Sequence, residues 1–425
     1  MLVSFWVENF KCFKDGTTFS MEATKLKNLK EDNTFSVNTI SLLKSAVIYG
    51  PNASGKSSIL QAMKKMKNIV IFSLLLGKEK KYQANPYLLN SSSSSKDTSF
   101  EIEFIIDEIL YRYGFSIATN SVITKEYLFQ KKLQSKAREV KLFTRDNSNF
   151  TLGAQFKEGK NLFDKTRENA LFLSVVAQFN GKISNSIIEW FEQFNILNNI
   201  KSKDFEHISF DMLEDELIKE KVIHFIKKAD LGIYDIVKKR LSFDDLKKDN
   251  PNIEKNLPDF IIDSIKEKGI NAIETSHIKY NEQQEFESFE NFNISLESDG
   301  TQKLLALSGP VLDSLINGKI LVIDELDNSL HTELVKAIVE LFNSKESNPN
   351  NAQLIFTTHD TNLLNQNLFR RDQIWFSQKN IFGECELYSL VEYGKGKTRN
   401  DLDLEKNYLE GKFGAIPHIN TLYEE

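Results

Sequence analysis

The chain has 425 residues, with 54 Lys and Arg against 60 Asp and Glu, and its net charge is −6 at pH 7. This length is too great for one simple core and predicts two lobes or two domains. The acidic balance gives no overall field that attracts nucleic acid, so binding of DNA or RNA would need a local basic patch. No apolar run reaches the ~20 residues that span a bilayer, and the N-terminus lacks the build of a signal peptide. Cys12 and Cys385 match no metal or redox spacing. We therefore expect a cytoplasmic protein with two ordinary thiols and no membrane partner.

The first elements along the chain are two strands. Leu2–Glu8 is rich in apolar residues, and a turn at Asp15 and Gly16 leads to a second candidate strand at residues 17–21. This arrangement predicts a hairpin.

Residues 50–57 (GPNASGKS) fit the phosphate-binding loop pattern. They lie between a buried strand, Ser45–Tyr49, and a segment whose apolar residues recur at helical spacing. In this context backbone N–H groups surround phosphate oxygens, Lys56 reaches the β- and γ-phosphates, and the Ser57 hydroxyl ligates Mg²⁺. The candidate residues for nucleotide binding are Asn52, Ser54, Gly55, Lys56, Ser57 and Ser58.

The next part of the chain changes to an alternating pattern. The serine run at residues 91–95 is interpreted as a flexible surface loop. Residues 99–106, 109–118 and 123–129 alternate apolar and polar side chains, which predicts an antiparallel meander forming a second sheet beside the nucleotide sheet. The basic stretch at residues 131–141 either contacts phosphates or forms a solvated hairpin tip, and the second interpretation is favoured.

Residues 161–230 have a helical period, with two apolar stripes that are typical of core packing. Residues 233–243 and 273–280 are predicted strands that enclose an exposed, polar helical excursion at residues 244–268. Sustained heptads are absent, so no long coiled coil is expected. The stripes consist of Leu171, Phe172, Val175, Val176 and Phe179, and of Ile187, Trp190, Phe191 and Phe194.

The last part of the chain contains a predicted helix at residues 300–316 and the buried strand Ile320–Ile323, which ends in Asp324 and Glu325. This is the form of a Walker B element, in which Asp324 completes the Mg²⁺ shell and Glu325 orients or deprotonates the attacking water. A further strand, Gln353–Thr357, is closed by His359 and Asp360. A short helical piece at 363–364 and strands at 374–376 and 387–390 complete the prediction.

The order of these motifs resembles that of ABC-type ATPase heads, and among them SMC-like heads rather than transporter subunits. Residues 7–11 (VENFK) resemble the opening strand of SMC-like heads. The loop at 50–57 resembles their GPNGSGKS sequence, with Ala53 in place of a glycine. Ser298 and Gly300, in SDGT, resemble the signature element that contacts the γ-phosphate held by a partner subunit.

Two further motifs extend the resemblance. Residues 326–331 (LDNSLH) are similar to a D-loop, in which Asp327 couples two sites across a dimer, and His359 looks like the switch histidine that stabilises the γ-phosphate. The signature departs from the usual LSGGQ form, because Asp299 replaces a glycine and Thr301 replaces the glutamine. No clear motif identifies the glutamine of the Q-loop, and Gln83 is our candidate for it.

The resemblance implies an α/β fold, an ABC-ATPase (SMC-like) two-lobed head with a P-loop nucleotide sheet, an antiparallel β subdomain and a compact, mainly helical insertion. The corresponding segments are 1–145, 146–290 and 291–425. It also implies a Mg²⁺-dependent ATPase that works as a homodimer or higher homo-oligomer around ATP, with Lys56, Glu325 and His359 as catalytic residues and Ser57 and Asp324 as metal ligands.

Finer features resemble the ATPases of bacterial phage-defence operons, the RloA type and its relatives in the PARIS and Septu systems. They include residues 171–174 (LFLS), 229–233 (ADLGI), 297–304 (ESDGTQKL), 371–376 (RDQIWF) and 408–417 (YLEGKFGAIP). This resemblance implies control of a separately encoded, nuclease-like effector. The alternative is an SMC-like maintenance or repair ATPase that clamps DNA directly, and a transporter ATPase is disfavoured.

Overall fold

The computed structural model describes residues 1–75, 82–134, 137–197, 216–228, 232–249, 253, 257–392 and 403–416. The chain forms two compact units: Met1–Asn199 with Ser314–Asn328 and Val335–Glu425, and Ile200–Asp313 with Ser329–Leu334. These limits do not coincide with the three expected segments, because much of segment 146–290 belongs to the first unit. Among the described residues, no helix is long and apolar enough to cross a membrane.

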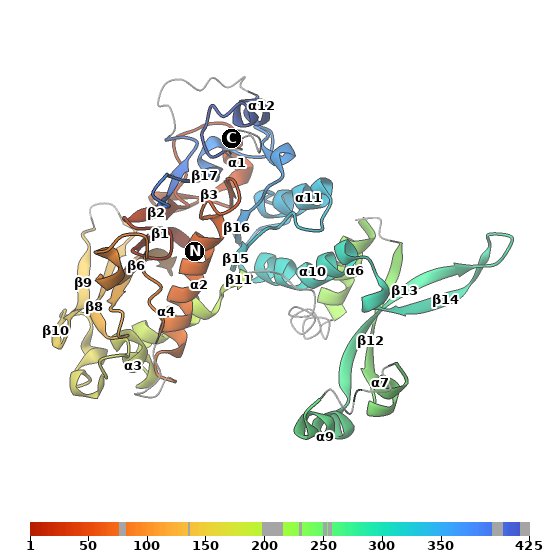
Figure 1. Cartoon of the computed structure of the whole chain (residues 1–425), viewed down its shortest axis with the longest axis horizontal. Helices are drawn as coiled ribbons and strands as arrows, with labels where there is room; N and C mark the ends of the chain where they lie inside the picture. The colour runs from red at the N-terminus through yellow and green to blue at the C-terminus, as the bar shows by residue number, and fades with distance from the viewer. Residues whose placement is uncertain are drawn as a thin grey trace, which may run out of the picture. The chain divides into compact units, whose positions relative to one another are not determined.

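A six-stranded sheet in the first unit carries the phosphate-binding loop (Figure 1). Strand β5 (Ser45–Tyr49) lies at its centre, and the neighbouring strands run parallel to it, except that β18 pairs with β17 in the antiparallel sense. Strands β5, β15 and β16 are buried along their whole length, as expected for a parallel sheet covered on both faces. The strand order is β11 (Phe194–Leu197), β15 (Ile320–Ile323), β16 (Gln353–Thr357), β5, β17 (Ile374–Lys379) and β18 (Cys385–Ser389).

A seven-stranded antiparallel sheet forms the second layer of this unit. The expected hairpin and meander are confirmed, and β9 and β10 extend the meander beyond the prediction. The basic stretch joins the antiparallel partners β8 and β9, so its described residues belong to a hairpin connection. The strand order is β10 (Asn149–Leu152), β9 (Val140–Asp146), β8 (Ile123–Lys132), β7 (Ile109–Ile117), β6 (Thr98–Ile106), β1 (Leu2–Glu8) and β2 (Thr17–Ser20).

Helix α2 (Lys56–Phe72) packs between these sheets, together with α3 (Phe172–Gln178) and α4 (Lys182–Glu192). Apolar side chains from both sheets and from the three helices form one continuous core. Gln353 joins the sheets directly: its side-chain oxygen accepts from Leu2 N at 2.6 Å, and its amide nitrogen donates to the carbonyls of Leu2 and Leu43 at 3.1 Å. The two sheets are therefore held by apolar packing and by a buried polar contact.

The remaining elements of this part lie around the two sheets. They are α1 (Lys30–Asn33), the β3 (Thr34–Val37) and β4 (Ile40–Leu43) hairpin, α11 (Thr332–Asn343), α12 (Leu404–Leu409), and short 3-10 helices at Ser93–Ser95, Lys157–Gly159, Phe163–Lys165, Thr361–Leu363 and Arg371–Gln373.

Two expectations in this unit are wrong. Phe194 was assigned to a helical stripe, but α4 ends at Glu192 and Phe194 begins β11, which pairs with β15. The serine run was expected to be a loop, but Ser93 is buried in the short helix Ser93–Ser95. Asn9 Nδ2 donates to the carbonyls of Ser93, Lys96 and Asp97, at 2.9, 2.9 and 3.2 Å, which fixes this segment against the end of β1.

The second unit contains a three-stranded antiparallel sheet, β12-β13-β14. Its core joins α6 to this sheet through apolar residues that include Val222, Ile226, Ile236 and Ile273. The helical excursion after β12 has a small core of its own. Residues 198–215 and 229–231, within or next to the predicted helical region, lie outside the described part. The elements are α6 (Glu216–Lys228), β12 (Ile233–Leu241), α7 (Phe243–Asp249), α9 (Asp259–Lys268), β13 (Ile270–Tyr280), β14 (Phe286–Asn293), a 3-10 turn (Ile294–Leu296) and the start of α10 (Asp299–Asn317).

Candidate nucleotide site

Three segments of the first unit meet because they follow three neighbouring parallel strands. The loop at 50–57 follows β5, Asp324 and Glu325 follow β15, and Thr358 and His359 follow β16. The carboxyl ends of parallel strands lie at the same edge of a sheet, which is where α/β folds bind ligands. Sequence-distant motifs are thus brought to one edge.

The loop requires left-handed backbone at several positions. Gly50 and Gly55 have φ of 153° and 107°, and Ala53 has φ of 61°. A Cβ at Gly50 would lie 2.2 Å from the carbonyl oxygen of Ser377, so only glycine fits there. Ala53 has the left-handed conformation at the position where the resembled loop has glycine, and this costs about 1 kcal/mol.

Lys56 is the first residue of α2 and is 6% exposed. Its Nζ donates to the carbonyls of Gly50 and Pro51, at 2.6 and 3.0 Å, so the side chain folds back over the loop. Burial lowers the pKa of Lys56 to about 8, and the nearby carboxylates of Glu325 and Asp324 act in the opposite direction. The ammonium is therefore held next to the space that phosphates would occupy.

Asp324 is buried and connects the motifs. Its Oδ1 accepts from the hydroxyl of Ser57 at 3.0 Å and from the hydroxyl of Thr357 at 2.7 Å. Thr357 Oγ1 in turn accepts from the backbone N–H of Glu325 at 2.7 Å. Thr357 therefore positions both acidic residues, a role that the sequence analysis did not assign. The signal in the sequence that could have identified Thr357 was its position as the last residue of the predicted strand Gln353–Thr357.

Glu325 and His359 line one cavity of about 300 Å³ together with loop residues 52–58. Glu325 has φ of 51°, an uncommon conformation for a non-glycine residue. Burial, and then the charge of Lys56, lowers the pKa of His359 below its usual value, although Asp327 opposes this shift. The neutral form of the His359 imidazole is therefore favoured. Its backbone N–H donates to Asp327 Oδ2 at 3.0 Å.

The groups at this edge fit a nucleotide with Mg²⁺. Among the described residues, the buried side-chain atoms Ser54 Oγ and Asp327 Oδ1 have no hydrogen-bond partner. A hydroxyl and a carboxylate oxygen, from Ser57 and Asp324, are the oxygen ligands that Mg²⁺ prefers, with the rest of its shell supplied by water and phosphate.

Three expected contributors do not line the loop cavity. Ser298 belongs to the second unit, where its Oγ accepts from Thr301 N at 3.2 Å and caps the start of α10. A Cβ at Gly300 would lie 2.7 Å from the Ser329 carbonyl oxygen, so this turn requires glycine. Gln83 is exposed and lines a neighbouring cavity of about 510 Å³, which shares Lys11, Cys12 and Lys379 with the loop cavity. The loop cavity does not include it.

The sequence analysis also missed Lys11, Cys12 and Lys379, which line the loop cavity. Cys12 and Lys379 come from the turn after β1 and the end of β17, so no local pattern could have joined them to the loop. A neighbouring cavity of about 640 Å³ is bounded by Tyr49, Gln378 and Tyr408 as well as by loop residues.

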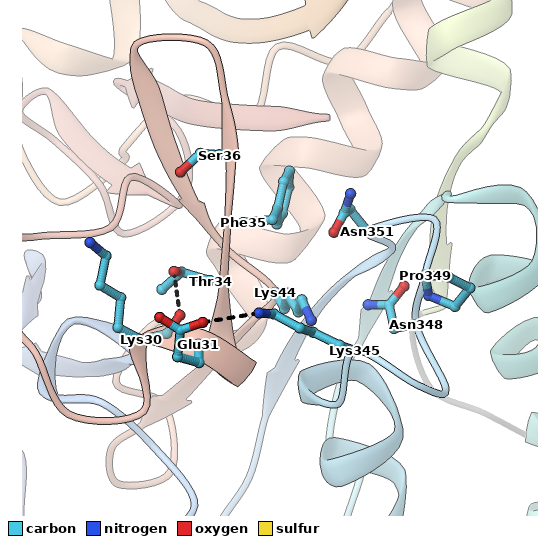
Figure 2. A pocket seen from close by; sticks show the side chains of 10 residues that line it. All are labelled: Lys30, Glu31, Thr34, Phe35, Ser36, Lys44, Lys345, Asn348, Pro349 and Asn351. Atoms are coloured by element: carbon cyan, nitrogen blue, oxygen red, sulfur yellow. Dashed lines mark hydrogen bonds and ion pairs between the residues drawn. The ribbon is translucent and has the colours of Figure 1, made fainter.

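A further cavity of about 450 Å³ lies around the β3 strand (Figure 2). Figure 2 shows the ion pair between Lys345 and Glu31, at 3.1 Å, at its side. Lys44, also on its lining, donates to the carbonyl of Asn343 at 3.0 Å. Neither the loop nor the acidic pair contributes to this cavity, so it is separate from the nucleotide site.

The fold and the site are those of a P-loop ATPase domain, and the expected α/β class with a nucleotide sheet and an antiparallel sheet is confirmed. Residues 45–365 match the family described as "AAA domain, putative AbiEii toxin, Type IV TA system". The chain belongs to this family. No curated protein matches the sequence.

Solved structures of SMC heads are similar in fold. An Smc head bound to the C-winged helix domain of ScpA is 14% identical, with a TM-score of 0.44, covering 91% of this chain and 97% of that chain. The SMC head domain from Thermotoga maritima is 12% identical, with a TM-score of 0.41 and coverage of 91% and 98%. An Smc head with an extended coiled coil, bound to the C-terminal domain of ScpA and derived from Pyrococcus furiosus, is 14% identical, with a TM-score of 0.42 and coverage of 91% and 96%.

Proposed function

We propose that the protein binds ATP with Mg²⁺ at the loop after β5 and hydrolyses it. The observation that carries this proposal is that one cavity is lined by the phosphate-binding loop, Glu325 and His359, and that Ser57 of this loop donates to the buried Asp324. Membership of an AAA-type family supports the same conclusion.

Each residue has a role that follows from its chemistry. Lys56 would exchange the carbonyls of Gly50 and Pro51 for β- and γ-phosphate oxygens. Ser57 and Asp324 would hold Mg²⁺, which when bound neutralises charge on the phosphates. Glu325 would orient the attacking water and accept its proton. The neutral imidazole of His359 would donate a hydrogen bond to the γ-phosphate, where charge develops.

The direct test is ATP binding and phosphate release by the purified full chain, with and without Mg²⁺. We expect saturable ATP binding and phosphate release that stops on chelation of the metal. Glu325→Gln should retain binding without rapid hydrolysis. Binding of ATP without any Mg²⁺-dependent phosphate release by the wild type would overturn the hydrolytic part of the proposal.

We infer further that ATP joins two copies of the chain, with Ser298 and Gly300 of one copy facing the nucleotide of the other. The supporting feature is the capped N-terminus of α10, a 19-residue helix, because helix N-termini favour anions. Light scattering of Glu325→Gln should give twice the monomer mass with ATP and Mg²⁺, and Gly300→Trp should prevent this. A monomer in both cases would contradict the inference.

The output of ATP turnover would be control of a partner effector, in our proposal a nuclease-like protein of a bacterial anti-phage system. The motif resemblance and the family's description as a putative toxin of a toxin–antitoxin system support this assignment. Affinity purification of Glu325→Gln from its host in ATP and Mg²⁺ tests it. Recovery of a nuclease-like protein with Glu325→Gln, and not with Lys56→Ala, is expected. Recovery of nuclease-sensitive DNA alone, with binding that falls steeply with salt, would favour a direct DNA clamp.

A further inference from the structure

Cys12 and Cys385 lie side by side beneath the phosphate-binding loop. The backbone N–H of Cys385 donates to the carbonyl of Cys12 at 2.8 Å. A Cβ placed on Gly55 would lie 2.8 Å from the sulfur of Cys385 and 3.0 Å from the sulfur of Cys12. Both thiols are free. Two sulfurs, distant in sequence, therefore form the floor under Gly55.

The two thiols differ in their access to small molecules. Cys385 is buried at 5% exposure, whereas Cys12 is half-buried and lines the cavity formed by the loop. The hydrogen bond from Cys385 is the largest influence and lowers the pKa of Cys12, with Ser58 and Lys379 acting in the same direction and burial opposing them. The same hydrogen bond raises the pKa of Cys385. Cys12 is thus the accessible sulfur and Cys385 the resolving one, which is the arrangement of redox-sensing pairs.

We propose that Cys12 and Cys385 are an oxidation site, at which a peroxide forms a disulfide beneath the loop, and that the disulfide form binds ATP weakly. In the first step, the Cys12 thiolate attacks one peroxide oxygen and the O–O bond breaks, which leaves a sulfenic acid and releases hydroxide or alkoxide (water or an alcohol after protonation). In the second step, the Cys385 sulfur attacks the Cys12 sulfur. The S–S bond forms, the S–O bond breaks, and the proton of Cys385 leaves with the hydroxyl as water.

The effect on the loop follows from packing. A disulfide requires the sulfurs to approach to about 2.05 Å, so at least one sulfur must move from its position beneath Gly55. The loop must keep the left-handed Gly55 conformation, with φ of 107°, to direct its N–H groups at phosphates. Oxidation therefore disturbs the phosphate site. The expected loss of ATP affinity rests on the proposed ATP binding.

The covalent part is tested on the full chain with hydrogen peroxide, followed by intact mass and peptide mapping. The expected product is a monomer lighter by about 2 Da, with Cys12 and Cys385 peptides linked and the linkage reversed by dithiothreitol. Cys385→Ser should instead trap a dimedone-reactive sulfenic acid at Cys12, heavier by about 16 Da before trapping. Disulfides only between separate chains, or sulfenic acid without linkage in the wild type, would overturn the proposal.

The functional part compares binding of a fluorescent ATP analogue by reduced, oxidised and re-reduced protein. We expect the oxidised form to bind at least about tenfold more weakly, with recovery after dithiothreitol. Equal binding by reduced protein and by protein with a mapped disulfide would refute the effect on the loop. Absence of binding by the reduced protein would refute the proposed ATP site itself, while the mass measurement would still decide whether the pair is oxidisable.

Discussion

The hydroxyl of Ser57 and Oδ1 of Asp324 lie 3.0 Å apart and join the phosphate-binding loop to the end of β15. The same carboxylate oxygen also accepts from Thr357, so two hydroxyls donate to one buried oxygen. Ser57 and Asp324 would hold a divalent cation here, because the Ser57 oxygen has lone pairs for a metal while its proton can still donate to the carboxylate. The site is therefore preassembled around a position that favours positive charge.

Replacement of Glu325 by Gln should slow ATP hydrolysis by at least about 10²-fold, because the amide cannot accept a proton from the attacking water. ATP binding should remain, since Glu325 contributes no phosphate ligand. Single-turnover phosphate release and equilibrium ATP binding are the measurements. Glu346→Gln, an exposed residue away from the cavity, is the matched control. Near-normal turnover by Glu325→Gln would remove Glu325 from the mechanism.

ATP affinity should depend on pH through Lys56. Its pKa of about 8 means that the ammonium form, which binds phosphate, is complete below this pH and is lost as the pH rises through it. Affinity should therefore fall about tenfold per pH unit above pH 8. Lys56→Ala should abolish binding. Lys56→Arg keeps its charge over this range, so any binding that remains should not vary with pH. A flat profile for the wild type between pH 7 and 9.5 would contradict the assignment.

Gly55→Ala should weaken ATP binding at least about tenfold and destabilise the fold by about 1–2 kcal/mol. The reason is double: φ of 107° disfavours an L side chain, and the new Cβ meets the sulfurs of Cys12 and Cys385. Gly232→Ala separates these causes, because its φ is also positive, at 68°, and a Cβ there meets nothing within 4 Å. We expect Gly232→Ala to bind ATP normally in the same assay. Normal ATP binding by Gly55→Ala would contradict this account, because it would show that the loop tolerates displacement of the two sulfurs beneath Gly55.

Arg370→Ala should destabilise the protein by about 3–5 kcal/mol, because it leaves a buried carboxylate without its partner. Arg370 is 0% exposed and forms two hydrogen bonds with Asp372, at 2.9 and 2.7 Å. It also donates to carbonyls of the segment before α1, including that of Thr24. Urea denaturation is the measurement, with Arg371→Ala as the neighbouring control. Equal effects of the two substitutions would contradict this account.

The elements that could be predicted are those specified by local pattern. The buried runs of β5, β15 and β16 and the motifs that follow them were found because strand, loop and chemistry are contiguous in sequence. β14 was missed because its phenylalanines, 286, 289 and 292, are spaced by three rather than two. Phe194 was misassigned because the apolar spacing of α4 continues into β11 without Gly or Pro between them.

Within the candidate site, Lys56, Ser57, Asp324 and Glu325 were predicted because each belongs to a motif. The contact between Cys12 and Cys385 could not be predicted from the sequence. It depends on the register of β18 and on the turn after β1, which packing alone decides. The position of Thr357 at the end of a strand could be predicted from the sequence. Its contact with Asp324 could not, because this contact depends on the pairing of β15 with β16.

The strand order has a consequence for how the protein is made. Strand β5, which leads into the phosphate-binding loop, has only β16 and β17 as neighbours in its sheet, and both come from the last quarter of the chain. During translation, residues 45–57 therefore leave the ribosome long before any partner strand exists. The nucleotide site therefore cannot form until β16 and β17 have been synthesised. Its completion waits for long-range pairing, the slow and aggregation-exposed class of folding event.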